Sequence, residues 1–359
     1  MEDSLRFIVL KSAKELGEKV NQEVNKLRND EKNYIVSITE NRFSNGEGKV
    51  VLNETVRDKN VYILGDIGNH SCMYSLFGYE NHMGPDEHFQ DIKRVISAIK
   101  GHASSVSVIM PLLYSSRQHR RKGRESLDCA LALQELERLG VNNIITFDVH
   151  DPNVQNAVPC MSFENFYPTV SMLSDFIDNE KVDYKNLIVV SPDTGAVDRA
   201  RYYADMLKTD VGMFHKRRDL SIVKDGHNPI VAHEYLGKDV KDKDIIVVDD
   251  MIDSGGSMLE VVSELKDRGA RKVYLFSTFA LFSKGIKKFQ EYYVKGKFDK
   301  LYSTNLTYVS DEVKNSPWFY QVNCAPYLAE IVNALDKHKS ISGLMNGKQK
   351  VLNRLPKQN

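Results

Sequence analysis

Residues 245–258 read Ile-Ile-Val-Val-Asp-Asp-Met-Ile-Asp-Ser-Gly-Gly-Ser-Met, and this stretch carries more information about fold and site than any other. Four apolar residues, typical of a buried strand, run into the adjacent carboxylates Asp249 and Asp250. A third carboxylate follows at Asp253, and the small residues 254–257 come next, before a helical apolar pattern. The stretch therefore predicts a buried strand, a tight loop and the start of a helix.

The chemistry of this loop suits a sugar phosphate. Small residues let backbone N–H groups approach an anion closely, and the N-terminus of a helix favours negative charge. Because carboxylates do not bind phosphate directly, Asp249 and Asp250 suit sugar hydroxyls or Mg²⁺. Phosphate beside hydroxyls indicates a phosphorylated ribose, although paired aspartates after a strand also commonly cap a helix.

The composition restricts the class of protein. The chain has 359 residues, which indicates about two domains of roughly 150 residues each. Its 49 basic and 49 acidic side chains cancel, which argues against a dedicated binder of nucleic acid or membrane surfaces. The four cysteines lack metal-ligand spacing, and no apolar run approaches the roughly 18 residues of a membrane span. We expect a cytoplasmic protein that binds neither nucleic acid nor membrane.

Strand and helix patterns alternate along the chain, which is typical of parallel sheets covered by helices on both faces. We predict the α/β class, with domains at 1–165 and 166–335 and a C-terminal tail at 336–359. Each domain is expected to be a mainly parallel sheet flanked by helices, and residues 4–28 an added N-terminal helix. The expected strands are 34–38, 50–52, 61–64, 106–113, 143–147, 187–190, 212–215, 245–248, 272–278 and 301–303. The expected helices are 86–99, 127–139, 166–177, 196–207, 259–265 and 284–291.

A histidine and two carboxylates follow the strand predicted at 143–147. Residues 148–151 read Asp-Val-His-Asp, at the end of a strand where open α/β sheets collect their ligands. His150 suits a metal ligand or an acid–base group, and a hydrogen-bonded structural histidine is an equal alternative.

Three more segments place charged side chains after predicted strands. Asp193, in Ser-Pro-Asp-Thr-Gly, suits either a ligand site or the cap of the next helix. The run 215–218, His-Lys-Arg-Arg, suits charge neutralisation in phosphoryl or pyrophosphoryl transfer, whereas such runs are usually solvated turns. The basic loop 117–124 contains no aromatic residue to stack on bases, which favours polyphosphate over nucleic acid. The chain has neither a P-loop motif nor a Rossmann glycine fingerprint, which excludes the commonest kinase architectures.

In this order, the motifs resemble those of the ribose-phosphate pyrophosphokinases, or phosphoribosyl pyrophosphate synthetases, from about residue 34 to residue 335. The run 249–257 resembles the ribose 5-phosphate loop of that family, and plain phosphoribosyltransferases share only this motif. The resemblance implies that both domains have the phosphoribosyltransferase-type fold.

The resemblance also implies a role for each motif. The residues implied to bind ATP are Phe43, Asn45, Glu47, Arg117, Gln118 and His150. The residues implied to bind ribose 5-phosphate are Asp249, Asp250, Asp253, Ser254, Gly255, Gly256 and Ser257. The implied catalytic residues are Lys216, Arg218 and His150. The implied metal ligands are His150 and Asp193, with Mg²⁺ as the cofactor.

The activity implied is the transfer of the pyrophosphoryl group of ATP to the C1 hydroxyl of ribose 5-phosphate. The products would be AMP and 5-phosphoribosyl 1-pyrophosphate, which serves nucleotide biosynthesis. The family also suggests a homo-oligomer built from dimers, such as a hexamer, because the loop that contains Phe43 usually serves a neighbouring subunit.

Several positions depart from the family's pattern. His119 stands where aspartate is usual, Ala196 replaces a glycine, and residues 126–129 replace the usual helix start. Segment 66–90 is longer than its counterpart and differs in composition. Two alternatives to the enzyme therefore stay open, namely a non-catalytic regulatory relative and a phosphoribosyltransferase.

Overall fold

The structure, a computed structural model, describes residues 4–121, 123–218 and 230–355, and its contacts divide the chain into two compact units. The first unit consists of Met1–Pro168, Asn305–Val309 and Asn323–Asn346. The second unit consists of Thr169–Thr304, Ser310–Val322 and Gly347–Asn359. The chain thus returns twice to the first unit, whereas the division predicted at residues 165 and 335 is linear.

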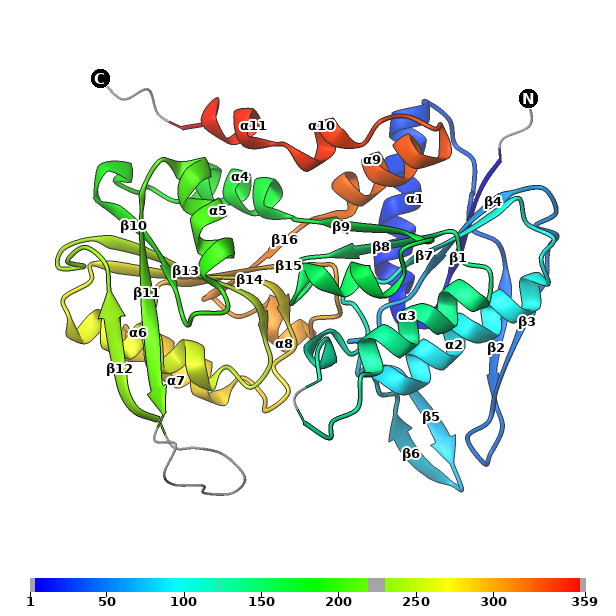
Figure 1. Ribbon diagram of the computed structural model, residues 1–359, viewed down its shortest axis with the longest axis horizontal. Helices are drawn as coiled ribbons and strands as arrows, with labels where there is room; N and C mark the ends of the chain where they lie inside the picture. The colour runs from blue at the N-terminus through cyan, green and yellow to red at the C-terminus, as the bar shows by residue number, and fades with distance from the viewer. Residues whose placement is uncertain (1–3, 122, 219–229, 356–359) are drawn as a thin grey trace. The chain divides into compact units, whose positions relative to one another are not determined.

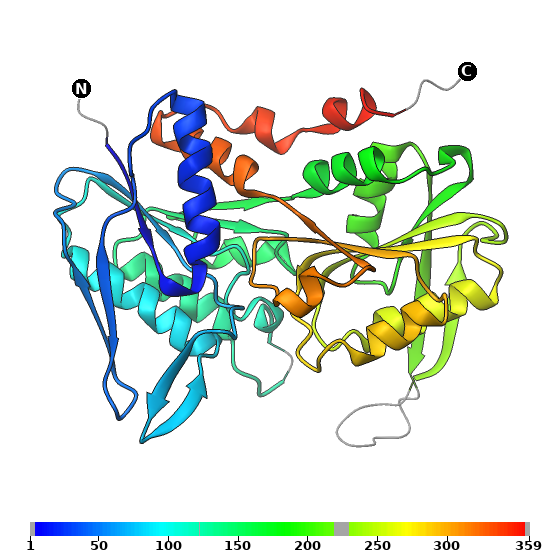
Figure 2. The same ribbon diagram turned by 180° about the vertical axis from the view of Figure 1, so that it is seen from behind.

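The first unit is built on a five-stranded sheet in the order β1-β4-β7-β8-β9, in which every neighbouring pair is parallel. Helices on both faces cover it, α2 and α3 on one side and α1 and α9 on the other (Figures 1 and 2). The strands are β1 (Leu5–Val9), β4 (Asn60–Leu64), β7 (Ser105–Ile109), β8 (Asn143–Phe147) and β9 (Ser162–Phe166). The helices are α1 (Lys14–Arg28), α2 (Pro85–Ile99), α3 (Asp128–Arg138), α9 (Ala325–Asp336) and α10 (Ser342–Met345).

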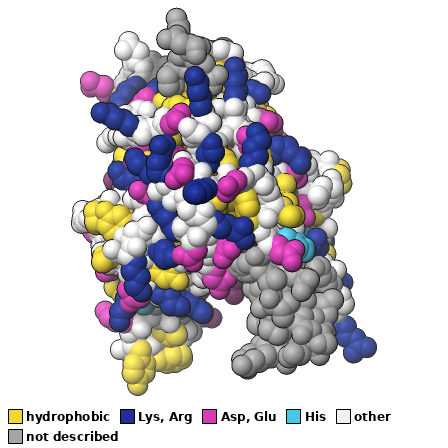
Figure 3. Space-filling model, turned by 90° about the vertical axis from the view of Figure 1, so that its left-hand side faces the viewer, with side chains coloured by type: hydrophobic (Ala, Val, Ile, Leu, Met, Phe, Trp, Pro, Cys, Tyr) yellow, Lys and Arg dark blue, Asp and Glu magenta, His cyan; other side chains and the backbone are white. Residues whose placement is uncertain are grey.

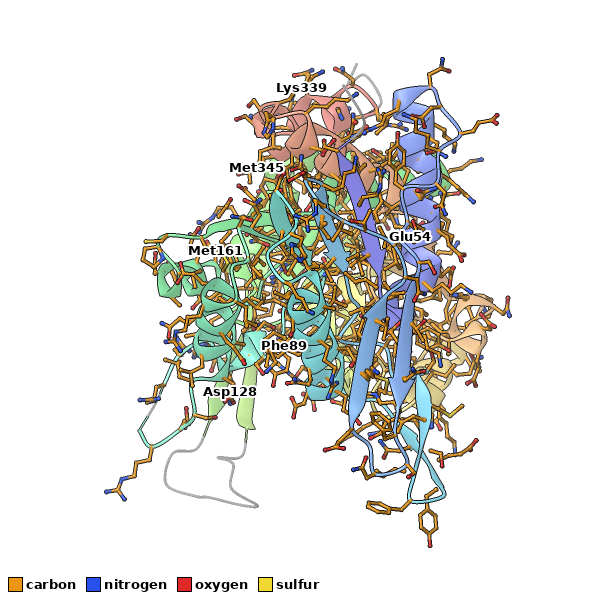
Figure 4. The ribbon with its side chains drawn as sticks, turned by 90° about the vertical axis from the view of Figure 1, so that its right-hand side faces the viewer. Glu54, Phe89, Asp128, Met161, Lys339 and Met345 are labelled. Carbon is orange, nitrogen blue, oxygen red and sulfur yellow. The ribbon has the colours of Figure 1, made fainter. Side chains whose placement is uncertain are left out.

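Two antiparallel hairpins extend from the first unit. One joins β2 (Ile38–Arg42) to β3 (Gly48–Leu52), and the other joins β5 (Met73–Leu76) to β6 (Tyr79–His82). Figure 4 shows both hairpins beside α2, the helix that carries the labelled Phe89.

The second unit is built on a seven-stranded sheet in the order β12-β11-β10-β13-β14-β15-β16, parallel except between β11 and β12. Helices α4, α5 and α11 lie on one face, and α6 and α7 lie on the other (Figure 1). The strands are β10 (Leu187–Ser191), β11 (Asp210–Arg218), β12 (Ile230–Leu236), β13 (Asp244–Ile252), β14 (Lys272–Ala280), β15 (Lys300–Thr304) and β16 (Phe319–Val322). The helices are α4 (Thr169–Asn179), α5 (Val197–Leu207), α6 (Gly256–Asp267), α7 (Lys287–Val294), α8 (Asp311–Lys314) and α11 (Lys348–Leu352).

The predicted N-terminal helix over residues 4–28 is wrong in its first third. Leu5–Val9 forms β1, which pairs with β4, and the helix α1 begins only at Lys14. Three of the five β1 side chains are almost fully buried, because a strand in a sheet covered on both faces buries side chains on both sides. The strand predicted at 34–38 is also wrong, since Ile35 makes one isolated bridge and β2 begins at Ile38.

The structure also contains elements that the sequence did not indicate. Segment 66–90 forms the unexpected β5–β6 hairpin before α2, whose helix was predicted at 86–99. Strand β13 continues to Ile252 instead of ending at 248, so Asp249 and Asp250 lie within the strand. Strands β9, β12 and β16 and helix α9 were not expected either, and two short helices, α10 and α11, lie in the predicted tail.

The surface carries both charge signs. On the face shown in Figure 3, Lys and Arg side chains are interspersed with Asp and Glu side chains. Among the residues that the structure describes, no helix combines the length and apolar character needed to cross a membrane.

Candidate active site

The carboxyl ends of β10 and β13 bring three aspartates to one edge of the second unit's sheet. The two strands are parallel neighbours, with Val190 opposite Val247. Asp193 follows β10, and Asp249 and Asp250 lie near the end of β13. Ligands bind at this edge in open α/β sheets. A sugar-phosphate site in the loop after β13 stays a prediction.

The surroundings of the Asp249 carboxyl group disfavour its charged form. Burial, the neighbouring charge of Asp250 and the more distant charge of Asp193 raise its pKa well above the usual range for aspartate. Arg199, in the first turn of α5, acts in the opposite direction, with its Nη1 3.9 Å from Asp249 Oδ1. Asp250 is 3% exposed. A cation or hydroxyl donors from a ligand would relieve this crowding of negative charge.

Arg199 is a residue that the sequence analysis missed. It lies six residues after Asp193, within Gly-Ala-Val-Asp-Arg. The signal that could have identified it was an arginine in the first turn of a helix that begins at the same sheet edge.

The loop after β13 has the backbone that was expected of a phosphate cradle. Gly255 has φ of +75° and precedes α6, and Ser254 and Ser257 beside it are exposed. A side-chain Cβ built at Gly255 would lie 2.3 Å from Cζ of the buried Phe289, so this position requires glycine. At Gly256, the nearest atom to such a Cβ is Ser254 Oγ, at 4.0 Å. The N-terminus of α6, an end of a helix that favours anions, follows directly.

Asp193 is not the N-cap of the next helix, which was one alternative from the sequence, because the N-cap residue of α5 is Ala196 and no side chain caps it. The Asp193 Oδ1 atom accepts hydrogen bonds from the N–H groups of Gly195 at 2.8 Å and Ala196 at 3.2 Å. These bonds fix the turn before α5, and therefore the position of Arg199 relative to Asp249. A role of Asp193 as a metal ligand stays a prediction.

The expected catalytic cations fall at the end of β11. The backbone of Lys216 is paired with His233 of β12, and that of Arg218 with Ile230. The side chains of Lys216 and Arg218 lie outside the described residues, as does segment 219–229. Their catalytic role therefore stays a prediction.

In the first unit, the structure brings together two of the segments predicted to bind ATP. His119 Nε2 lies 3.2 Å from Asp151 Oδ2, and the rings of His119 and His150 are 5.5 Å apart. Arg117 and Gln118 lie in the short helix Ser116–Gln118 that directly precedes His119, and both are exposed. His119, a departure from the family's pattern, therefore joins the basic loop to the end of β8.

The third ATP segment forms the tip of the β2–β3 hairpin. Phe43 N–H donates to the Glu47 carbonyl at 2.8 Å, and Asn45 Nδ2 donates to Glu47 Oε2 at 3.0 Å. The Phe43 side chain is 53% exposed. The loop thus presents an aromatic ring and polar groups to solvent.

The metal site stays a prediction. In the parts of the chain covered by the structure, no three or more His, Cys, Asp or Glu side chains are arranged to hold a metal ion. Of the two expected ligands, His150 belongs to the first unit and Asp193 to the second.

Two protein-family models match the chain in sequence order. Residues 5–140 match the N-terminal domain of ribose phosphate pyrophosphokinase, and residues 163–305 match the phosphoribosyl transferase domain. The chain is 30% identical to a ribose-phosphate pyrophosphokinase of Haemophilus influenzae, over 85% of this chain and 90% of that protein. It is 29% identical to the Wolinella succinogenes protein of the same name, over 86% of this chain and 90% of that protein.

A solved structure has the same fold. The phosphoribosylpyrophosphate synthetase from Mycobacterium smegmatis aligns with a TM-score of 0.76 at 22% identity, over 93% of this chain and 99% of that one. This likeness confirms the predicted α/β fold class with phosphoribosyltransferase-type domains.

Replacing Gly255 with alanine should destabilise the second unit by about 2–4 kcal/mol, because the methyl group overlaps Phe289 and the backbone is left-handed. Gly256→Ala is the matched control and should lower stability much less, since its methyl group meets open space. Thermal unfolding of both variants measures the difference. Equal stability of the two variants would contradict the packing described for this loop.

Proposed function

This chain belongs to the ribose-phosphate pyrophosphokinase family, and we propose that it transfers the β,γ-pyrophosphoryl group of ATP to the C1 hydroxyl of ribose 5-phosphate. The products are AMP and 5-phosphoribosyl 1-pyrophosphate, a precursor in nucleotide biosynthesis. The observation that carries the proposal is the crowded carboxylate pair of half-buried Asp249 and buried Asp250, beside a glycine loop before the helix α6.

Ribose 5-phosphate binds along the end of β13. The backbone N–H groups of Gly255 and Gly256 and the hydroxyls of Ser254 and Ser257 hold the 5-phosphate at the N-terminus of α6. The carboxylates of Asp249, Asp250 and Asp253 accept hydrogen bonds from the ribose hydroxyls or hold them through a metal ion. Hydrogen bonds and a cation both favour the charged form of Asp249, whose pKa is raised when the ligand is absent.

Mg²⁺ is the metal that this proposal calls for, because carboxylate oxygens suit a hard cation. The residues that would hold it are Asp193 and His150, with Asp249 and Asp250 on the sugar side. When bound, Mg²⁺ neutralises charge on the phosphate oxygens of ATP.

ATP binds through the first unit in this proposal. Arg117, Gln118 and His150 contact the nucleotide, and the contact of His119 with Asp151 supports their common location. Phe43, Asn45 and Glu47 contact the adenine of a neighbouring copy. This contact requires a homo-oligomer, which we propose to be built from dimers, such as a hexamer. We also propose that the enzyme is cytoplasmic.

The chemistry is an in-line displacement at the β-phosphorus of ATP. The C1 oxygen forms a bond to that phosphorus, the bond from the phosphorus to the α–β bridging oxygen breaks, and the hydroxyl proton is released to water. Lys216 and Arg218 stabilise the charge that develops on the bridging oxygen as it leaves with AMP. Catalysis consists of positioning and electrostatics, without a covalent enzyme intermediate.

Two observations argue against the alternative functions, a plain phosphoribosyltransferase and a non-catalytic regulatory relative. A plain phosphoribosyltransferase does not explain why residues 5–140 match the N-terminal domain of the pyrophosphokinases. A non-catalytic regulatory relative would not need the strained pair Asp249 and Asp250, and it is distinguished by an activity assay.

Incubation of the protein with ATP, Mg²⁺ and ribose 5-phosphate should yield AMP, and omission of ribose 5-phosphate should abolish it. Chromatographic separation of AMP, ADP and ATP measures the products. Absence of AMP would favour the regulatory relative. AMP that forms without ribose 5-phosphate would exclude the proposed acceptor.

Replacing Lys216 with alanine should lower kcat by about 10²-fold or more, because one cation that acts on the leaving oxygen is removed. The KM for ribose 5-phosphate should change little, since this lysine acts on the nucleotide side of the reaction. Lys238→Ala is the control, as Lys238 is 70% exposed and ion-paired with Asp210. Steady-state kinetics that show equal kcat for both variants would remove Lys216 from the mechanism.

A further inference from the structure

The two hairpins of the first unit are joined at their tips. The Phe77 N–H donates a 2.7 Å hydrogen bond to the carbonyl of Ser44, which lies in the loop 43–47 of the β2–β3 hairpin. Gly46 in that loop has φ of +91°, and a Cβ built there would lie 2.9 Å from Leu76 Cδ1. Figures 1 and 4 show the β5–β6 tip beside this loop. The loop therefore rests on the second hairpin through one backbone hydrogen bond and a close apolar contact.

A second contact joins the hairpins one residue before Phe43. The Arg42 guanidinium lies over the Tyr74 ring, 5.4 Å from its centroid, and donates a hydrogen bond to Asp91 of α2. The Arg42 and Asp91 side chains are only 13% and 8% exposed, so this ion pair is largely shielded from solvent. The Tyr74 hydroxyl donates a hydrogen bond to Glu87 in the first turn of α2. Tyr74 thus links the β5–β6 hairpin to α2 and to Arg42, the last residue of β2 before the 43–47 loop.

Strand β3 of this hairpin packs on α2, whereas the loop 43–47 at its tip contacts the β5–β6 hairpin. A two-stranded hairpin is at best marginally stable in water without a further element against which to pack. The internal bonds of loop 43–47 are local, and the Phe43 ring has more than half its surface exposed. A mobile loop would have to be ordered when its ligand binds, and that ordering lowers affinity.

We propose that the β5–β6 hairpin is a positioning element that holds loop 43–47 in its nucleotide-binding conformation, with Tyr74 as the main positioning residue. This inference rests on the proposed function, because it takes the loop to contact the adenine of ATP. It assigns a role to segment 66–90, one of the segments that the sequence analysis identified as a departure from the family's pattern. The hairpin acts on nucleotide affinity and leaves the chemical step and the ribose 5-phosphate site unchanged.

The test compares three substitutions in the β5–β6 hairpin, with Phe43→Ala in the loop as a reference for lost nucleotide contact. Tyr74→Ala removes the ring under Arg42 and the hydrogen bonds of the hydroxyl, whereas Tyr74→Phe keeps the ring and removes only those hydrogen bonds, to Glu87 and Asn81. Tyr74→Ala should raise the KM for ATP about tenfold, the cost of reordering one or two loop side chains. Tyr74→Phe should raise it less, and both variants should keep kcat and the KM for ribose 5-phosphate. Tyr79→Ala is the matched control, because this 79% exposed ring makes no hydrogen bond or ring contact in the described part of the chain.

The outcomes separate this inference from the function on which it rests. The positioning role would be supported if the KM for ATP rises tenfold in Tyr74→Ala, rises less in Tyr74→Phe and does not rise in Tyr79→Ala. An unchanged KM in both Tyr74 variants, while Phe43→Ala raises it, would overturn the positioning role and leave the proposed function intact. If the protein makes no AMP, the proposed function fails, and calorimetric titration with ATP tests the same order of affinities. If Tyr74→Ala does not fold, Tyr74→Phe decides, and a KM or Kd equal to that of the unmodified chain overturns the inference.

Discussion

The end of β13 imposes the constraint on which the proposed active site depends. Asp249 and Asp250 are adjacent carboxylates that follow the buried apolar residues 245–248 of β13, and Arg199 is 3.9 Å from the first of them. Charge that is removed from water and repelled by a neighbour raises the free energy of the folded state. Such an arrangement makes physical sense where a ligand supplies the missing hydrogen-bond donors or cation, as ribose hydroxyls and Mg²⁺ would. The glycine loop and the N-terminus of α6 provide the complementary place for a phosphate.

The residues proposed to bind ATP are positioned in a different way. They lie in exposed loops, which contacts outside the strands attach to the first unit. His119 bridges to Asp151, and the β5–β6 hairpin supports loop 43–47. These supports fall at positions that depart from the family's pattern.

Sequence reasoning succeeded where one local pattern determined the outcome. Strand β8 was predicted residue for residue, because an apolar run lies between a helix and a charged turn. The N-terminal strand β1 was missed, because five apolar-rich residues beside a charged helical pattern become a strand only through pairing with β4, which is distant in sequence. The β5–β6 hairpin was missed for a related reason, since its strands have only four residues each and are stabilised by Arg42 and α2. The candidate site residues were proposed from motifs and stay predictions, whereas Arg199 and the His119 contact became visible only in the tertiary structure.

The central claim is that a pyrophosphoryl group, and not a single phosphoryl group, moves from ATP to C1 of ribose 5-phosphate. Phosphorus NMR of the reaction mixture tests this claim most directly, because it identifies which phosphates remain with adenosine and which are attached to the sugar. The account predicts AMP and a ribose that carries a diphosphate at C1 and a monophosphate at C5, in equal amounts. ADP together with a ribose bisphosphate would contradict it.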